Sequence, residues 1–174
     1  SVVSVLVCSS RCDINQQYRN IIMGKLKGVP AILSPEILHL LAITGHGDQI
    51  LLADINYPTH SICSAEGGPR EIRADGLGIP ALLDAITTLM PLDQYVESPI
   101  QLMERTQSDI AKGMVVPVWQ EYRKICDKNE QPPVKFEMVE RMEFYERSRK
   151  VMAIIHTGET AAYGNIILTR GVCN

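Results

Sequence analysis

The feature that most constrains the fold is a short apolar run without polar alternation, Ile50-Leu51-Leu52-Ala53. Such a run is typical of a β-strand that is covered on both faces. Val151 to Ile155 and Ile166 to Leu168 repeat the pattern near the end of the chain. Segments with helical periodicity separate these runs, so we predict an α/β fold: one layered α/β/α domain with a central mixed sheet.

The remaining elements are predicted from their start and stop signals and their apolar periodicity. Ser34-Pro35 begins a first helix, with Ile37, Leu38, Leu41 and Ala42 on its covered face, and Gly45 ends it. We predict further helices from residue 79 to about Leu89, over 117–128 and within 139–150, and strands over 71–75 and 99–103. Residues 59–69 are predicted to be a loop, and Gln131-Pro132-Pro133 a short break.

Length and charge exclude several classes of protein. A chain of 174 residues suits one domain that buries a sizeable core. The net charge of −3 and the absence of basic runs argue against nucleic-acid binding. Five cysteines without a CxxC pair indicate reduced thiols and a cytoplasmic protein.

The first 22 residues differ from the rest of the chain. The apolar run from Val2 to Val7 is too short to span a bilayer, so no membrane association is expected. It also lacks the basic lead of a secretory signal. We predict that residues 1–22 are an extension outside the core fold, that Met23 is a natural start, and that 23–174 form the domain. A targeting or docking arm is the alternative.

The two ends of the 50–53 strand carry polar side chains. His46 lies in a turn between two glycines just before the strand, where a ligand can approach closely. Histidine side chains exchange protons near neutral pH and so suit acid–base catalysis. Asp54 follows the strand, and a carboxylate beside a buried strand requires a partner. The alternative for His46 is an ordinary surface residue, and Asp48 can simply bond turn amides.

A metal or nucleotide site is not indicated. The four histidines, His39, His46, His60 and His156, are widely spaced and form neither HxH nor HExxH. The chain has no Walker loop, no GxGxxG and no GxSxG elbow. We therefore expect no metal and no cofactor.

A third group of candidates lies in the last third of the chain: Arg141, Tyr145, Tyr163 and Asn165. Arginine and asparagine are directional donors, and tyrosine offers a hydroxyl and a flat face. The set suits a polyhydroxylated ligand such as a sugar. An alternative explains the same residues equally well: Arg141 would lie on a charged, solvated helix, and the tyrosine would stabilise a hairpin.

A string of short motifs is similar to that of the fucose mutarotase family, which is grouped with the ribose pyranases. They occur in the family's order from about Met23 to Gly171, and include GHGD at 45–48, AD at 53–54, IRADG at 72–76, FYER at 144–147, TGE at 157–159 and YGN at 163–165. The string is specific as a whole, although each piece alone is not. Residues 1–22 have no counterpart in the family.

The resemblance implies an enzyme that interconverts the α and β anomers of L-fucose without a cofactor. It implies that His46 is the proton donor and that Tyr145, or an ordered water, is its counterpart. It assigns sugar binding to Asp54, Arg141, Tyr163 and Asn165, and to Asp93 and Met103 from a neighbouring subunit.

The resemblance also implies a homo-oligomer, from a dimer to a decameric ring, with sites near subunit contacts. Two alternatives remain at this point: a ribose pyranase-type enzyme and a non-catalytic sugar-binding protein on the same fold. The presence of both His46 and Tyr145 favours the enzyme, because a protein that only binds sugar could dispense with them.

Overall fold

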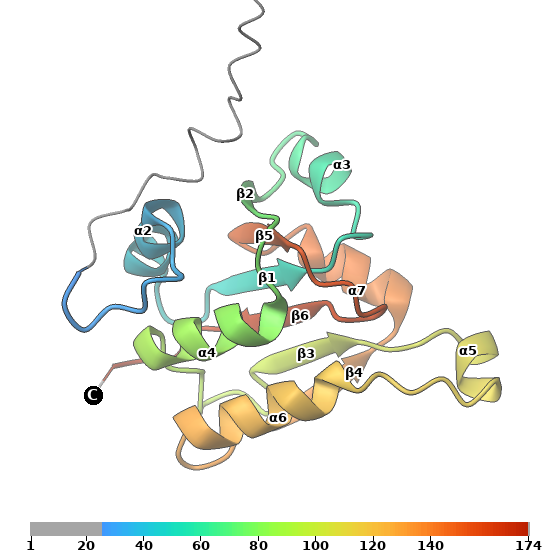
Figure 1. The fold of residues 1–174 in the computed structure, drawn as a ribbon. Helices are drawn as coiled ribbons and strands as arrows, with labels where there is room; N and C mark the ends of the chain where they lie inside the picture. The colour runs from blue at the N-terminus through green and yellow to red at the C-terminus, as the bar shows by residue number, and fades with distance from the viewer. Residues whose placement is uncertain (1–25, 174) are drawn as a thin grey trace, which may run out of the picture.

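The computed structural model describes residues 26–173, and the predictions about residues 1–22 and Met23 lie outside this range. Six strands form one mixed sheet in the order β2-β5-β1-β6-β3-β4 (Figure 1). The strands are β1 Gln49–Ala53, β2 Arg70–Ala74, β3 Ile100–Met103, β4 Phe136–Val139, β5 Ala153–Thr157 and β6 Ile166–Thr169. Strand β6 runs antiparallel to β1 and β3, whereas the β1–β5, β2–β5 and β3–β4 pairs are parallel. The predicted α/β fold with a mixed sheet is confirmed.

Helices cover both faces of this sheet. The described helices are α2 Pro35–Ile43, α3 Thr59–Cys63, α4 Ile79–Leu89, α5 Gln107–Ala111, α6 Val118–Asn129 and α7 Arg141–Ser148. Side chains of α2, α4 and α6 join the larger core on one face, and those of α3 and α7 join a second core on the other. In Figure 1, α4 and α6 lie side by side in front of the sheet, and α5 projects beyond its edge. The continuous apolar strands follow from this arrangement, because every residue of β3, β5 and β6 is buried.

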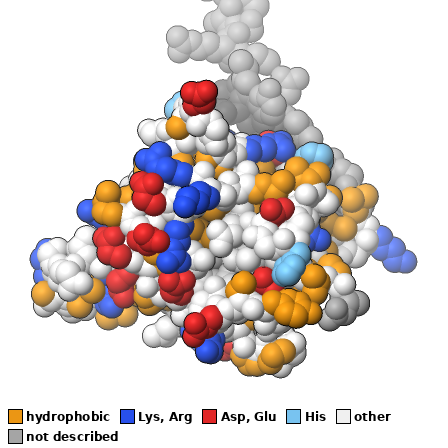
Figure 2. All heavy atoms as spheres, turned by 180° about the vertical axis from the view of Figure 1, so that it is seen from behind, with side chains coloured by type: hydrophobic (Ala, Val, Ile, Leu, Met, Phe, Trp, Pro, Cys, Tyr) orange, Lys and Arg blue, Asp and Glu red, His pale blue; other side chains and the backbone are white. Residues whose placement is uncertain are grey.

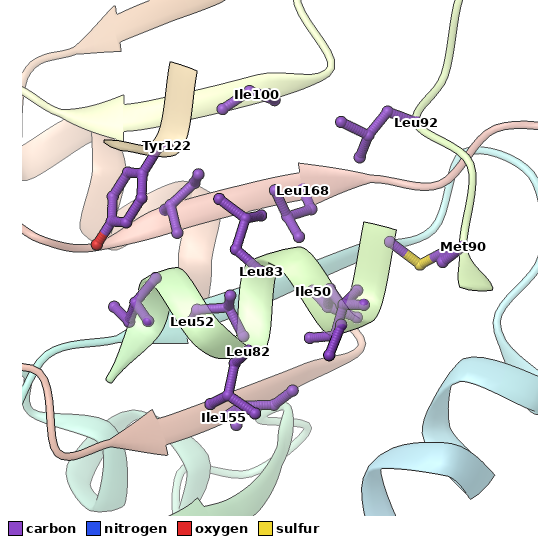
Figure 3. Close-up of a cluster of buried hydrophobic side chains, with 14 of the residues drawn as sticks. Ile50, Leu52, Leu82, Leu83, Met90, Leu92, Ile100, Tyr122, Ile155 and Leu168 are labelled. Atoms are coloured by element: carbon purple, nitrogen blue, oxygen red, sulfur yellow. The ribbon is translucent and has the colours of Figure 1, made fainter. Parts of the chain in front are cut away.

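The larger core is built where α4 crosses the middle strands (Figure 3). Leu82 and Leu83 point from α4 to the sheet, where Ile50 and Leu168 lie at most 1% exposed. Each such side chain contributes on the order of 1.5–3 kcal/mol to folding when it is fully buried. At the end of α4, Leu89 is 36% exposed, whereas the following Met90 is buried.

The N-termini of α2 and α4 are capped in two different ways. Ser34 caps α2, since its hydroxyl accepts a hydrogen bond from the backbone N–H of Ile37 at 3.2 Å. Gly78 has no side chain to cap α4, and Oε2 of Glu159 accepts from the N–H of Ile79 at 3.2 Å instead. The turn after β5 is thereby attached to the start of α4.

Three elements were missed by the sequence patterns. The predicted 59–69 loop contains α3, and α5 and β4 lie in segments where no element was expected. Strand β5 begins at Ala153 and not at Val151, because the chain first turns after α7. In α2 the covered face carries Leu40, while Ala42 is exposed, contrary to the prediction.

Two further properties concern membranes and metals. Within residues 26–173, no helix is long and apolar enough to cross a bilayer. The same part of the chain holds no group of three His, Cys, Asp or Glu side chains that could bind a metal ion. Its four histidines lie apart, on α2, the turn before β1, α3 and β5.

The turn that follows β5 leaves no room for a side chain at Gly158. A Cβ atom added there would lie 2.2 Å from the backbone oxygen of Asp75, which cannot move without displacing its strand. We expect Gly158→Ala to lower the free energy of unfolding by about 1–3 kcal/mol, the usual range for overpacking. Thermal melting should show a decrease of roughly 2–4 °C per kcal/mol for a domain of this size.

Gly76 provides the matched control, because a Cβ atom there would meet nothing within 4 Å. Gly76→Ala should therefore melt close to the unsubstituted protein. Equal melting temperatures for the two variants would contradict the close packing of the 158 turn.

Candidate functional site

The predicted site residues lie in two groups, at opposite ends of β1. One group surrounds the Gly45–Asp48 turn that leads into the strand, and the other surrounds Asp54, which follows it. Strand β1, which separates them, has five residues and alone covers roughly 16 Å at about 3.3 Å per residue. No monosaccharide spans that length, so the groups do not meet within one copy.

The turn that presents His46 is fixed by its neighbours. Oδ2 of Asp48 accepts from the N–H of Gly45 at 2.6 Å, and Gly47 has a positive φ of +85°. The backbone of Arg170 pairs with this turn on both sides, with Gly47 N to Arg170 O and Arg170 N to Asp48 O both at 2.9 Å. The Arg170 guanidinium also donates to the carbonyl of Leu41 in the last turn of α2 and to the hydroxyl of Thr44 at 2.8 Å. The turn is therefore tied to the end of α2 and to β6.

Within this turn, His46 is paired with a buried carboxylate. Nε2 of His46 lies 3.2 Å from Oδ2 of Asp93, whose side chain is 2% exposed, whereas that of His46 is 48% exposed. Oδ1 of Asp93 accepts from the N–H of Tyr95 at 2.9 Å, and the Tyr95 ring meets the imidazole edge-on with centroids 5.7 Å apart. Asp93 thus orients an imidazole that remains accessible from outside.

The other group lines a cavity of about 360 Å³, a size common for small-molecule sites. Its walls come from the loop after β1, the end of β3, the α5 segment, α7 and the loop before β6. The lining residues are Asp54, Asn56, Tyr57, Met103, Asp109, Met114, Arg141, Tyr145, Ala162, Tyr163 and Asn165.

Asp54 and Asn165 are joined by reciprocal hydrogen bonds at the base of this cavity. Nδ2 of Asn165 donates to Oδ2 of Asp54 at 2.7 Å, and the backbone N–H of Asp54 donates to Oδ1 of Asn165 at 2.9 Å. The N–H of Asn56 donates to Oδ1 of Asp54 at 2.9 Å. Burial nevertheless raises the pKa of Asp54, because desolvation of the charged form outweighs these bonds.

Tyr163 is held in a strained conformation beside this pair. Its φ of 62° is unusual for a residue other than glycine. Its carbonyl accepts from Nε1 of Trp119 at 2.9 Å, and its hydroxyl donates to Oδ2 of Asp109 at 2.7 Å. Strain of this kind persists only where the surroundings fix it and is concentrated at functional sites.

Two further tyrosines form an aromatic wall. The rings of Tyr57 and Tyr145 lie 5.5 Å apart, and the Tyr57 hydroxyl is buried without a partner among the described residues. Burial raises the pKa of Tyr57, so its phenol stays neutral. Together with Met103 and Met114, these rings add apolar surface to the cavity that also contains the polar Asp54–Asn165 pair.

The structure thus separates the eight predicted residues into two sets. Asp54, Met103, Arg141, Tyr145, Tyr163 and Asn165 line the cavity, whereas His46 and Asp93 contact one another at the far end of β1. The sequence analysis missed Asn56, Tyr57 and Ala162, although they adjoin predicted residues. It also missed Asp109 and Met114, which lie in a segment where no pattern indicated structure.

A second, larger cleft of about 710 Å³ contains none of the predicted residues. Three of its charged groups are in ion pairs, with Lys135 to Glu97 at 3.5 Å and Arg147 to Glu137 at 2.9 Å. The fourth, Arg123, donates to the carbonyl of Val134 at 3.2 Å. It is lined by Val96, Glu97, Ser98, Arg123, Lys135, Phe136 and Glu137.

Comparison with known proteins identifies relatives of this chain. The chain is 55% identical over 150 residues to the fucose mutarotase of Homo sapiens and 54% identical over 151 residues to that of Bos taurus, in each case across 86% of this chain and 96% or 95% of the relative. A crystal structure of the fucose mutarotase of Streptococcus pneumoniae in complex with L-fucose superposes with a TM-score of 0.77 at 43% identity, covering 86% of this chain and all of that one. Residues 27–173 match the model of the RbsD / FucU transport protein family. The chain therefore belongs to the RbsD / FucU transport protein family.

Proposed function

We infer that this protein is an L-fucose mutarotase, an isomerase that interconverts the α and β anomers of the sugar. Its similarity to curated fucose mutarotases and to a fucose-bound structure supports this activity. The observation that carries the assignment in this chain is the cavity around Asp54 and Asn165, which combines fixed polar groups with an aromatic wall. That combination fits a monosaccharide, which presents hydroxyls on its edges and C–H groups on its faces.

The reaction requires two proton transfers and no cofactor. The ring oxygen must gain a proton while the anomeric hydroxyl loses one, so that the C1–O5 bond breaks and a C1 aldehyde forms. After rotation about C1–C2, the reverse transfers close the ring on the other face. We propose that His46 protonates the ring oxygen and that Tyr145, or an ordered water, receives the anomeric proton. Acid–base catalysis of this kind contributes typically about 100- to 10,000-fold to the rate.

We propose that each complete site is formed by two copies of the chain. His46 and Asp93 would come from one copy and the Asp54–Asn165 cavity from another, because one copy cannot bring them to the same sugar. Exposed apolar side chains in the segments around His46 support a contact there: Tyr95, whose ring meets the imidazole, is 77% exposed, and Ile43 at the end of α2 is 48% exposed. Figure 2 shows hydrophobic side chains beside histidines on the right-hand part of this face.

In this arrangement Asp93 has a defined task. The carboxylate accepts a hydrogen bond from the imidazole at Nε2, so the other ring nitrogen is left to face the sugar or a relayed water. Asp93 can do this because its own position is fixed by the N–H of Tyr95 and by the backbone bond from Asp93 N to Thr169 O at 3.0 Å.

Removal of the imidazole should eliminate catalysis. We expect His46→Ala to reduce the exchange between L-fucose anomers by about 100- to 10,000-fold, measured by saturation-transfer NMR. His39→Ala is the matched control, since His39 is an exposed histidine on the preceding helix and should retain full exchange. Undiminished exchange in the His46 variant would rule out its role as the acid, and binding without exchange in the unsubstituted protein would favour a non-catalytic sugar-binding protein.

A shared site predicts complementation between inactive variants. His46→Ala and Asp54→Asn damage different halves, so mixed oligomers contain some sites with both halves intact. Random mixing in equal amounts places an intact His46 next to an intact cavity in about a quarter of the sites, for a dimer and for a ring alike. Co-expressed variants should therefore recover roughly a quarter of the unsubstituted exchange rate. If the mixture stays as inactive as its components, the two halves do not come from different copies.

The raised pKa of Asp54 predicts how fucose binding depends on pH. The ionised carboxylate can accept a sugar hydroxyl, and it becomes protonated as pH falls through a value above the ordinary aspartate range. As the pH is lowered, the dissociation constant for L-fucose should therefore begin to rise at a higher pH than it would with an aspartate of ordinary pKa. The effect on folding has the opposite sign: the folded state binds this proton more readily, so the contribution of Asp54 to stability grows as pH falls through the same window.

Isothermal titration calorimetry at several pH values measures this dependence. Repeating each titration in buffers of different ionisation enthalpy reports the proton released when the sugar binds. Asp54→Asn should bind weakly and lose the proton release, whereas Asp127→Asn, at an exposed position on α6, should behave as the unsubstituted protein. An affinity that is constant down to the ordinary aspartate range would contradict a role for the Asp54 carboxylate.

A further inference from the structure

Three tyrosines line the cavity, and their hydroxyls have different surroundings. Tyr57 has a buried hydroxyl without a partner in the described chain, and no hydrogen bond from the Tyr145 hydroxyl to another described residue is observed. Tyr163 alone is bonded to a carboxylate, with its hydroxyl 2.7 Å from Oδ2 of Asp109. The aspartate belongs to the α5 segment, which the chain inserts between β3 and α6.

The bonds around this pair fix which atom donates. Oδ2 of Asp109 also accepts from the hydroxyl of Thr106 at 2.9 Å, and Oδ1 lies 3.6 Å from Nζ of Lys112. The hydrogen bonds from Tyr163 and Thr106 lower the pKa of Asp109, so the carboxylate is ionised and can only accept. The single proton of the Tyr163 hydroxyl must therefore be the one donated to Asp109.

We propose that Asp109 is a positioning residue for sugar binding: by taking the Tyr163 proton, it turns the phenol oxygen into an acceptor for a hydroxyl of the sugar. The proposal rests on the function inferred above and adds to it a residue and a hydrogen-bond direction. The neighbouring Asp54 carboxylate also accepts, while Asn165 and Arg141 donate. The cavity thus combines carboxylate and phenol acceptors with amide and guanidinium donors, which matches sugar hydroxyls that donate and accept in turn.

The same bond holds one wall of the cavity in place. None of the residues of α5 is buried, so its own packing does little to fix it against the domain. The segment is attached by the Asp109–Tyr163 bond, by a longer bond of 3.4 Å from Thr106 N to the Tyr163 hydroxyl, and by Arg105, whose guanidinium lies 5.5 Å from the centre of the Trp119 ring. Asp109 and Met114 of this segment line the cavity, so the phenol–carboxylate bond positions both the acceptor and the wall.

Trp119 provides a direct reporter of binding. It is the chain's single tryptophan, and its Nε1 donates to the carbonyl of Tyr163 at 2.9 Å. Its fluorescence during titration with L-fucose therefore measures affinity without reference to catalysis. Saturation-transfer NMR at saturating fucose measures the catalytic rate on the same samples.

Loss of the Asp109 carboxylate should weaken binding more than catalysis. We expect Asp109→Ala to raise the dissociation constant by about 10- to 100-fold, as for loss of a charge-assisted hydrogen bond, with exchange at saturation changed by less than about threefold. Asp109→Asn retains a neutral acceptor and should fall between Asp109→Ala and the unsubstituted protein. Asp127→Asn, an exposed aspartate on α6 with no contact to the cavity, is the matched control and should bind normally.

Tyr163→Phe decides whether Asp109 acts through the phenol. Tyr163→Phe should weaken binding to a similar extent, and Asp109→Ala in that background should add less than about a twofold effect. Three results would each overturn the proposal. The effects of the two substitutions on the dissociation constant could multiply in the double variant, Asp109→Ala could bind with normal affinity, or Asp109→Ala could exchange more slowly at unchanged affinity. If the unsubstituted protein neither binds nor exchanges L-fucose, the inferred function and the proposal both fail. If the unsubstituted protein is active and the Asp109 variants bind L-fucose equally well, the function stands and only the proposal fails.

Discussion

The cavity depends on the reciprocal hydrogen bonds between Asp54 and Asn165. These residues are 111 positions apart, yet they lie at adjoining ends of β1 and β6, which are neighbours in the sheet. The amide of Asn165 donates to the carboxylate of Asp54, and the backbone N–H of Asp54 donates to the amide oxygen of Asn165. A buried carboxylate is therefore tolerated there without a cation. The pair also keeps the end of β1 in register with the loop that carries Tyr163. Displacement of either residue would therefore move the polar base of the cavity and its tyrosine together.

Several of these features reduce stability locally. Ionised Asp54 is disfavoured by burial, Tyr163 has a positive φ, and the Tyr57 hydroxyl is buried without a hydrogen-bond partner in the described chain. All three lie at one cavity, whereas the neighbouring middle strands are close-packed and apolar. The sheet and α4 supply the stability that allows the unfavourable groups to be held in place. Such a distribution is expected when a site is selected for binding and not for folding.

The sequence predicted the elements whose pattern reflects burial. The apolar runs of β1 and β6 were recognised because both faces of the sheet are covered, and α4 because its apolar residues repeat at helical spacing. Strand β4 was missed because it lies at the sheet edge, where Glu137 and Met138 are not buried and the pattern is broken. Helix α5 was missed because it buries no residue and so leaves no periodic signal. Asp109 was missed for the same reason, since only its contact with Tyr163 reveals its position.

The predicted site illustrates what residue types alone cannot convey. Sequence motifs indicated His46 and Asp54 correctly as polar ends of one covered strand, but that placement itself keeps them apart in a single chain. With His46 as the proposed acid, the rigid strand between it and the cavity makes an isolated copy unsuited to acid–base chemistry on a small sugar. The same rigidity becomes useful when copies associate, because each strand then presents an imidazole at one end and a pocket at the other with fixed spacing. Assembly would in that case be a condition of catalysis. The imidazole of one copy and the Asp54–Asn165 pair of another would reach the same sugar only across a contact between copies.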